Sequence, residues 1–81
     1  MNITIKYTGQ YCTLTGKKKE TLEVETGKTL DHLIDILGDE YDLRSLLEEG
    51  TLFLINDKIA KRQQVLSEGD EVHVFQMMAG G

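Results

Sequence analysis

The spacing of the apolar residues changes twice along this chain, and no other feature of the sequence limits the fold so strongly. Ile3, Ile5 and Tyr7 alternate with polar residues, which is the period-two spacing of a β-strand with one buried face. A shorter alternation across residues 22–25 predicts a second strand of the same kind. We interpret the intervening segment, residues 9–19, as a loop with a short turn, because it is rich in Gly, Thr and Lys.

The middle of the chain has the spacing of a helix. Apolar residues recur there at intervals of three and four, as on one face of an α-helix, at Leu30, Leu33, Ile34 and Leu37. Thr29 is suited to cap the N-terminus of this helix, and Gly38 is suited to end it. The leucines within residues 43–47, followed by Gly50, predict a second and shorter helix.

Extended segments return in the C-terminal part of the chain. Residues 51–56 (TLFLIN) are apolar at four successive positions, which predicts a strand at the centre of the sheet. Residues 56–57 (Asn-Asp) predict a turn, and a brief extended piece follows at residues 59–60. After a further tight turn at residues 68–70, the last strand is expected to cover residues 72–77.

These segments together predict an α+β domain. One main helix and a short second helix, laid against a mixed sheet of four to five strands, form the β-grasp or ubiquitin-like arrangement. The chain has 81 residues, which is the size of one domain. We therefore expect residues 1–81 to form a single domain, with residues 78–81 as a flexible C-terminal tail.

The charge balance and the metal-binding residue types narrow the classes of partner. Nine Lys and Arg against fourteen Asp and Glu give a formal net charge of −5, which repels phosphate backbones and anionic lipids. We expect no nucleic-acid and no membrane partner, and favour a partner with a basic docking surface. The single cysteine, Cys12, and two isolated histidines predict no metal site. Without a signal-peptide pattern or an apolar run of ~18 residues, we expect a cytoplasmic protein.

The alternation of the last strand turns an aromatic residue away from the core. If Val72 and Val74 face the helix, then Glu71, His73 and Phe75 face outward. The apolar residues expected on this outward face are Leu54, Ile59, Phe75 and Met77. Exposed apolar patches mark docking sites, so we interpret this one as a partner-binding surface. In the alternative, the short strand and the segment after the main helix curl over this face and bury it.

The last two residues, Gly80 and Gly81, follow directly on this strand. Because they carry no side chains, they would let a terminal carboxylate pass through a narrow channel into another protein's active site. There the carboxylate can attack the α-phosphate of ATP and become an acyl adenylate, which is an activated electrophile. A sulfur nucleophile would then leave a thiocarboxylate, whereas an amine would leave an amide. We therefore regard the carboxylate of Gly81 as the reactive group.

Three stretches of the chain resemble one known family. The sequence EGDEVHVFQMMAGG, residues 68–81, is similar to the turn, last strand and Gly-Gly tail of the ubiquitin-like sulfur carriers. That family comprises the molybdopterin synthase small subunit and the thiamine sulfur carrier. LINDKIA, residues 54–60, resembles its central strand and the following turn. TGKKKETLEVETGKTLDHLIDIL, residues 15–37, resembles the long first hairpin and helix of the molybdopterin branch.

The resemblance implies a function in sulfur transfer. It places the thiocarboxylate on Gly81, the flexible glycine on Gly80, the exposed aromatic on Phe75, and the hydrophobic residue after the central-strand turn on Ile59. It implies three partners: a ubiquitin-activating-type adenylyltransferase that uses ATP and Mg, a sulfurtransferase, and a synthase large subunit or thiazole synthase. The chain itself would be a carrier or synthase subunit, without a bound cofactor or an active site of its own.

The sequence differs from the pattern of the molybdopterin branch at two places. The molybdopterin branch often carries a phenylalanine late in the first strand, where this chain has Thr8, and Phe-Pro-Pro before the tail, where this chain has Phe-Gln-Met-Met. The second feature is closer to the thiamine branch. The long segment between the first two strands favours molybdopterin instead, and we expect that pathway rather than thiamine thiazole synthesis. Two alternatives stay open: a protein modifier conjugated through Gly81, and a non-covalent β-grasp binding module.

Overall fold

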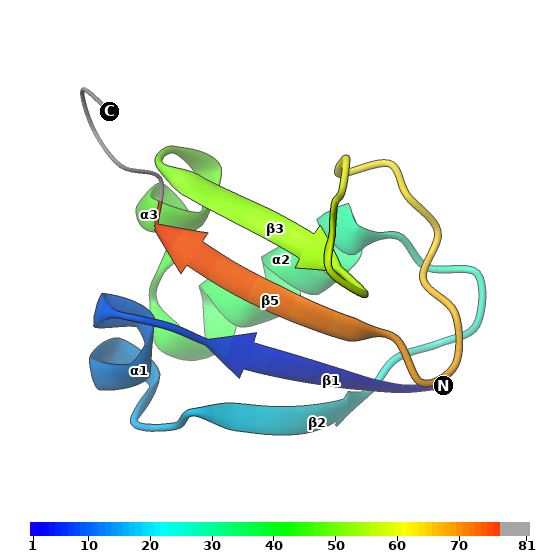
Figure 1. The fold of residues 1–81 in the computed structure, drawn as a ribbon, viewed down its shortest axis with the longest axis horizontal. Coiled ribbons are helices and arrows are strands. Elements are labelled where there is room, and N and C mark those ends of the chain that lie inside the picture. Colours follow the sequence, from blue (N-terminus) through cyan, green and yellow to red (C-terminus); the bar gives the residue numbers. More distant parts are fainter. Residues whose placement is uncertain (77–81) are drawn as a thin grey trace.

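The computed structural model describes residues 1–76, apart from the side chains of Ser45 and Glu48. A five-stranded mixed sheet lies against one long helix (Figure 1). The strands are β1 (Asn2–Tyr7), β2 (Lys19–Glu23), β3 (Thr51–Ile55), β4 (Lys58–Ile59) and β5 (Glu71–Gln76). The helices are α1 (Gln10–Thr15), α2 (Leu30–Tyr41) and α3 (Arg44–Glu48). This is the predicted α+β, β-grasp architecture. The expected tail, residues 78–81, lies outside the described residues.

The sheet has the strand order β2-β1-β5-β3-β4. β1 and β5 are parallel, and the other neighbouring strands are antiparallel. The central strand is β5, so the prediction that β3 is central is wrong, although β3 does have a neighbour on each side. Its apolar run has another cause, since its two faces meet different surroundings. Phe53 and Ile55 are buried in the core, whereas Leu52 and Leu54 are half-buried on the opposite face.

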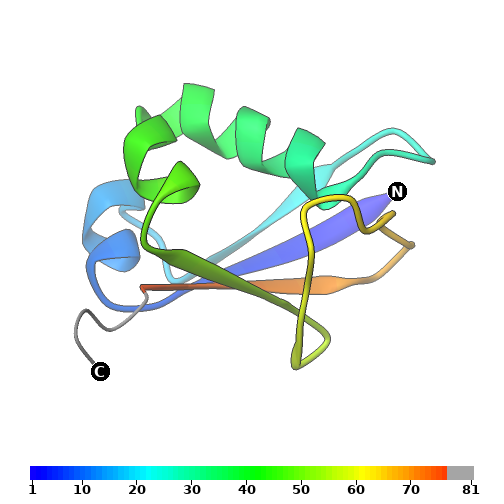
Figure 2. The ribbon, with the colours of Figure 1, turned by 90° about the horizontal axis from the view of Figure 1, so that it is seen from above.

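The core lies on one face of the sheet. Figure 2 shows α1, α2 and α3 on the same side of the sheet, and no helix within residues 1–76 covers the other side. The predicted helical stripe of α2 is buried, as are Ile5 of β1 and Val72 and Val74 of β5. The alternative in which the segment after the main helix covers the open face is wrong, because Leu43 and Leu47 of that segment are buried in the core.

The main helix begins where the sequence predicts and ends later. The Thr29 hydroxyl accepts a hydrogen bond from the backbone N–H of His32 at 3.4 Å, so this residue is the N-cap. Gly38 is not the C-cap, since α2 continues to Tyr41 and ends at Asp42, whose φ of 55° is left-handed. A Cβ at position 38 would lie 3.4 Å from the Cα of Arg44. This glycine therefore allows the close approach of α3 instead of ending α2.

The segment between the first two strands is more ordered than the sequence predicts. Residues 10–15 form α1, where a loop with a short turn was expected. The helix lies between two glycines in the left-handed region, Gly9 at φ 57° and Gly16 at φ 75°. Tyr11 is fully buried beneath it. A six-residue helix shows too little periodicity to be recognised in sequence, and the burial of this tyrosine fixes its position.

Two tight turns set the other end of the sheet. Asn56 and Asp57 both have positive φ, 50° and 69°, which is the type I′ geometry that suits a two-residue hairpin between β3 and β4. The Asn56 side-chain amide donates to the Asp70 carboxylate at 2.9 Å, and its side-chain oxygen accepts from the backbone N–H of Glu71 at 3.0 Å. This asparagine thus joins the hairpin to the start of β5.

Within residues 1–76, each helix is too short or too polar to cross a membrane.

Candidate docking face

The open face of the sheet carries a row of side chains that crosses four strands. In the strand pairing, Ile59 of β4 lies opposite Leu54 of β3, and Leu54 lies opposite His73 of β5. His73 in turn lies opposite Lys6 of β1. Side chains at opposite positions on one face of a sheet are close enough to touch. This row therefore places two aliphatic side chains, an imidazole and an ammonium group in one continuous line.

A second pair lies one step nearer to the C-terminal end of β5. Leu52 of β3 is opposite Phe75. The rings of Phe75 and His73 lie 5.5 Å apart between centroids, at an interplanar angle of 51°. The two steps together form a patch, which we call the outer patch, that consists of Leu52, Leu54, Ile59, His73 and Phe75. Ile59 is 73% exposed, and the other four residues are half-buried.

The outer patch includes most of the residues that the sequence singled out. Leu54, Ile59 and Phe75 lie together on the open face, as the alternation predicts, while their role in partner binding stays a prediction. Met77 lies outside the described residues, as do Gly80 and Gly81. The predicted patch omitted Leu52 and His73. Alternation placed both on the outward face, but only the strand register shows that they adjoin Phe75.

Charged residues border the outer patch on the side of β1. The Lys6 ammonium lies 2.8 Å from the Glu71 carboxylate. The hydrogen bond between them raises the pKa of Lys6 and lowers the pKa of Glu71, so both groups stay ionised at neutral pH. Such exposed pairs contribute little to folding stability. The pair places one positive and one negative charge at fixed positions along the β1 side of the outer patch.

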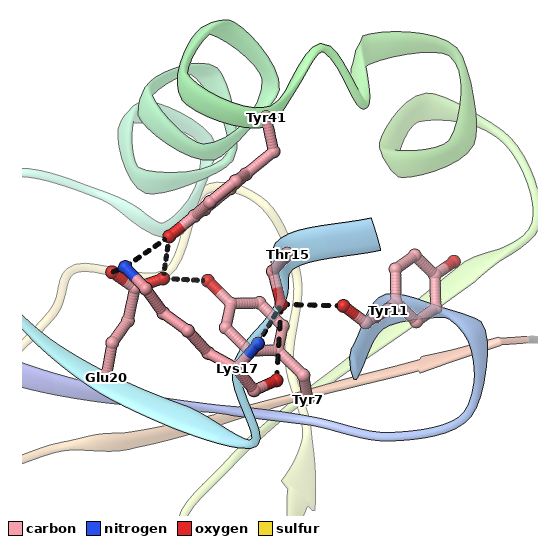
Figure 3. Close-up of polar contacts among 6 residues, drawn as sticks. All are labelled: Tyr7, Tyr11, Thr15, Lys17, Glu20 and Tyr41. Atoms are coloured by element: carbon pink, nitrogen blue, oxygen red, sulfur yellow. Dashed lines mark hydrogen bonds and ion pairs between the residues drawn. The ribbon is translucent and has the colours of Figure 1, made fainter. Parts of the chain in front are cut away.

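A separate polar cluster lies on the helix side, at the edge of the sheet (Figure 3). The Glu20 carboxylate of β2 accepts hydrogen bonds from the hydroxyls of Tyr7 at 2.6 Å and Tyr41 at 2.5 Å, and Lys17 lies 3.3 Å from its other oxygen. Burial opposes the ionisation of Glu20, but the bonds from Tyr41, Tyr7 and Lys17 outweigh it and lower the pKa. Burial raises the pKa of Tyr7, and so does its bond to Glu20.

This cluster connects β1, β2 and α2, and its polar groups are paired with one another. Its carboxylate is ionised and saturated with donors, which suits a structural anchor better than a proton-transfer group. Residues 1–76 hold no group of metal-binding side chains and no pocket. Among residues 1–76, the outer patch is the surface best suited to a partner.

The fold and the outer patch define the protein as a ubiquitin-like β-grasp domain. The model of the ThiS family matches residues 5–81, and the chain therefore belongs to the ThiS family of ubiquitin-like sulfur carriers. The matched range extends through the two terminal glycines. A search of curated protein sequences gave no match.

Solved structures show the same fold at low sequence identity. SAMP1, the small archaeal modifier protein 1 of Haloferax volcanii, has a TM-score of 0.86 and 19% identity over 100% of both chains. The putative molybdopterin converting factor subunit 1 of Pyrococcus furiosus has 0.85 and 19%, over 96% of this chain and 99% of that one. Subunit 1 in the Helicobacter pylori complex of molybdopterin-converting factor subunits 1 and 2 has 0.72 and 18%, over 100% of both.

Proposed function

We propose that this protein carries sulfur as a thiocarboxylate on Gly81. The observation that carries the proposal is the outer patch, a continuous apolar surface on an acidic domain, which lies on the strand that leads to Gly80 and Gly81. Membership of the ThiS family supports it. A partner that grips the outer patch holds the domain at a fixed distance from the tail, so that docking and chemistry occupy separate parts of the chain.

The proposed chemistry has two steps, both in the active site of a partner. In the first, a carboxylate oxygen of Gly81 attacks the α-phosphorus of ATP, and pyrophosphate leaves. In the second, hydrosulfide or a sulfurtransferase persulfide attacks the acyl carbon, and AMP leaves with the electron pair of the broken C–O bond. With hydrosulfide the product is the thiocarboxylate directly. With a persulfide it is an acyl disulfide that a thiol then reduces to the thiocarboxylate.

The side chains of this domain have docking roles in the proposal. Phe75 and Ile59 fill apolar depressions on a ubiquitin-activating-type adenylyltransferase, which binds Mg-ATP and supplies the catalytic groups. The charged edge formed by Lys6 and Glu71 sets the orientation. Gly80 and Gly81 pass into the active site because they lack side chains. The protein is then a carrier or co-substrate that acts in the cytoplasm, and it needs no cofactor of its own.

For the destination of the sulfur, we propose a molybdopterin synthase large subunit in preference to a thiazole synthase. Two structures of molybdopterin-converting factor subunit 1 share the fold over at least 95% of each chain, and one of them is a complex with subunit 2. The ordered α1 between the first strands matches the long segment that we associated with the molybdopterin branch. The segment before the tail, Phe-Gln-Met-Met, argues for the thiamine branch and keeps that destination as the rival.

Intact-mass spectrometry tests the proposal. The protein is incubated with an adenylyltransferase of this type from the same genome, Mg-ATP and sulfide. We expect a mass increase equal to the replacement of one oxygen atom by sulfur, and no increase in a variant that lacks Gly81. An unchanged mass in the full chain, with an enzyme that activates another carrier in parallel, would refute the sulfur-carrier function.

A second function shares this tail chemistry. SAMP1 of Haloferax volcanii, whose name describes a modifier, has the same fold over the whole chain. In a modifier, a lysine amine of a target protein takes the place of the sulfur nucleophile and forms an isopeptide bond with Gly81. Cells that express the tagged protein would then contain conjugates of higher mass that disappear when Gly81 is deleted. A non-covalent binding module would keep its function after Gly80 and Gly81 are removed.

A further inference from the structure

Four elements meet where β5 ends, at the base of the segment that leads to Gly81. Figure 1 shows the end of β5 beside α1 and α3. Gln76, the last described residue, lies opposite Thr51, the first residue of β3. The hydroxyls of Thr51 and Tyr11 are 2.5 Å apart, although 40 residues separate them in the sequence. α1 is therefore attached at this corner by a side-chain contact with β3.

The direction of the hydrogen bonds at this corner follows from the number of protons. The Thr51 hydroxyl donates to the backbone carbonyl of Leu46 in α3. A threonine hydroxyl carries one proton, so the bond between the two hydroxyls must be donated by Tyr11. The result is a relay from Tyr11 to Thr51 to Leu46, in which Tyr11 is fully buried. It satisfies one of the carbonyls that the short α3 leaves unbonded at its C-terminal end.

A second contact holds the neighbouring residue of β5. The Thr8 hydroxyl donates to the backbone carbonyl of Val74 at 2.9 Å. Thr8 precedes α1 and Tyr11 lies in it, so one short segment contacts Val74 of β5 and Thr51 of β3, the residue opposite Gln76. This explains why the segment between the first strands is a helix with a buried tyrosine, where a loop would have sufficed to connect the strands.

The position of this corner determines where a tail can begin. Gly81 lies five residues beyond Gln76, and five fully extended residues span at most about 18 Å. Each further residue released from the sheet must be ordered again when the tail enters a partner, and ordering one residue changes an equilibrium constant roughly tenfold. A fixed end of β5 therefore fixes the point from which residues 77–81 begin.

We propose that Tyr11 is a positioning residue for the reaction of Gly81, because its hydroxyl fixes the end of β5 through Thr51. The effect on the reaction of Gly81 rests on the proposed function, whereas the fixing of the end of β5 rests on the structure alone. Docking uses the outer patch on the open face, while Tyr11 acts from the helix side. Loss of its hydroxyl therefore changes how the tail reaches the active site, while Ile59, Leu54 and His73 of the docking surface lie away from this corner and keep their places.

The test compares Tyr11→Phe with Tyr41→Phe. Each variant loses one tyrosine hydroxyl, but Figure 3 shows Tyr11 pointing away from Glu20, to which Tyr41 is bonded. In Tyr11→Phe we expect faster amide hydrogen exchange at Phe75, which pairs with Leu52 of β3. We also expect a roughly tenfold lower kcat for ATP–pyrophosphate exchange with the adenylyltransferase, with KM for the carrier within about twofold. Tyr41→Phe should keep both values of the unmodified protein.

Substitutions at Thr51 complete the test. Thr51→Ser keeps the hydroxyl and should keep the kcat, whereas Thr51→Val should reproduce Tyr11→Phe. Unchanged exchange at Phe75, whose amide pairs with Leu52 of β3, would overturn the inference, as would an equal loss of kcat in Tyr41→Phe. If the unmodified protein supports no ATP–pyrophosphate exchange, the proposed function fails. The amide exchange of Phe75 then still decides whether Tyr11 fixes the end of β5.

Discussion

The two faces of β5 consist of alternate residues of one strand, and they have different roles. One face packs in the core, and the other is open to solvent. On the helix side, Val72 and Val74 are fully buried. On the open side, His73 and Phe75 are half-buried and touch each other and the leucines of β3. The two valines contribute to a small core, because an 81-residue domain buries a smaller fraction of its surface than a larger one does. The aromatic residues on the open face are not part of that core, and they leave apolar surface exposed to water.

The difference in burial between the two faces of β5 separates the residues that stabilise the fold from those that are available to a partner. A side chain that is half-buried without any element above it loses only part of its contact with water on folding, so most of its apolar surface stays available to a partner. The helix side is closed by three helices and by the polar cluster around Glu20, whereas the open side has no such cover within residues 1–76. Neighbouring substitutions on β5 should therefore separate stability from docking.

The largest expected effect is on the buried side. Val74→Ala removes two methyl groups from a fully buried position and should lower the free energy of unfolding by about 2–3 kcal/mol. The total for a chain of this size is about 4–12 kcal/mol, so the variant still folds. Urea denaturation measures the loss. At a temperature where the variant is folded, its KM in the adenylyltransferase reaction should be unchanged, and a raised KM would contradict the division between the faces.

The neighbouring residue on the open side should give the reverse result. Phe75→Ala should change the free energy of unfolding by less than about 1 kcal/mol, since the ring keeps much of its exposure in the folded state. As a central aromatic of the proposed interface it should lower kcat/KM of the adenylyltransferase reaction by about 30-fold, mainly through KM. A variant that loses stability and keeps its kcat/KM would place Phe75 in the core and remove the outer patch from the docking surface.

The smallest effect concerns the polar cluster that closes the helix side. The pKa of Glu20 is lower in the folded protein than in the unfolded chain, so its stabilising contribution is present above the unfolded pKa of about 4.3. That contribution is lost as the pH falls through the lower, folded value. Glu20→Gln should cost about 1 kcal/mol at pH 7, because a neutral acceptor replaces a charged one.

Denaturation curves between pH 7 and about pH 3 test this sign. The difference between the two proteins should shrink as the medium becomes acidic, because the carboxyl group of the unmodified protein is then protonated. A difference that stays constant or grows would show that Glu20 is not held ionised by the two tyrosine hydroxyls. Neither protein should differ in KM for the adenylyltransferase, since the cluster lies on the opposite face from the outer patch.

Much of the fold could be predicted from local patterns. Alternation assigned Val72 and Val74 to the core and Phe75 to the open face, because a strand has only two faces and a choice for one residue decides the next. The helical stripe and its cap at Thr29 were equally accessible, since both depend on residues within one turn. These patterns are local, and they were sufficient to give the order of the elements other than α1 and the class of the fold.

The remaining errors all concern contacts between one secondary-structure element and another. Gly38 has the composition of a helix end, but its lack of a side chain serves the approach of Arg44. α1 depends on a tyrosine buried against Thr51, which lies 40 residues away. Leu52 and His73 join the outer patch through strand register. Neither propensity nor periodicity contains the identity of a distant neighbour, so no local pattern could have revealed these contacts.

By itself, then, the sequence determined the elements other than α1, the inward or outward direction of the residues on β5, and the family to which its last residues belong. The tertiary structure alone decided that β1 and β5 are parallel neighbours, that Ile59, Leu54 and His73 form one row, and that Tyr11 reaches the first residue of β3. The physical reason is that the direction of a side chain follows from the local backbone repeat. The neighbours that it meets follow from how the whole chain packs.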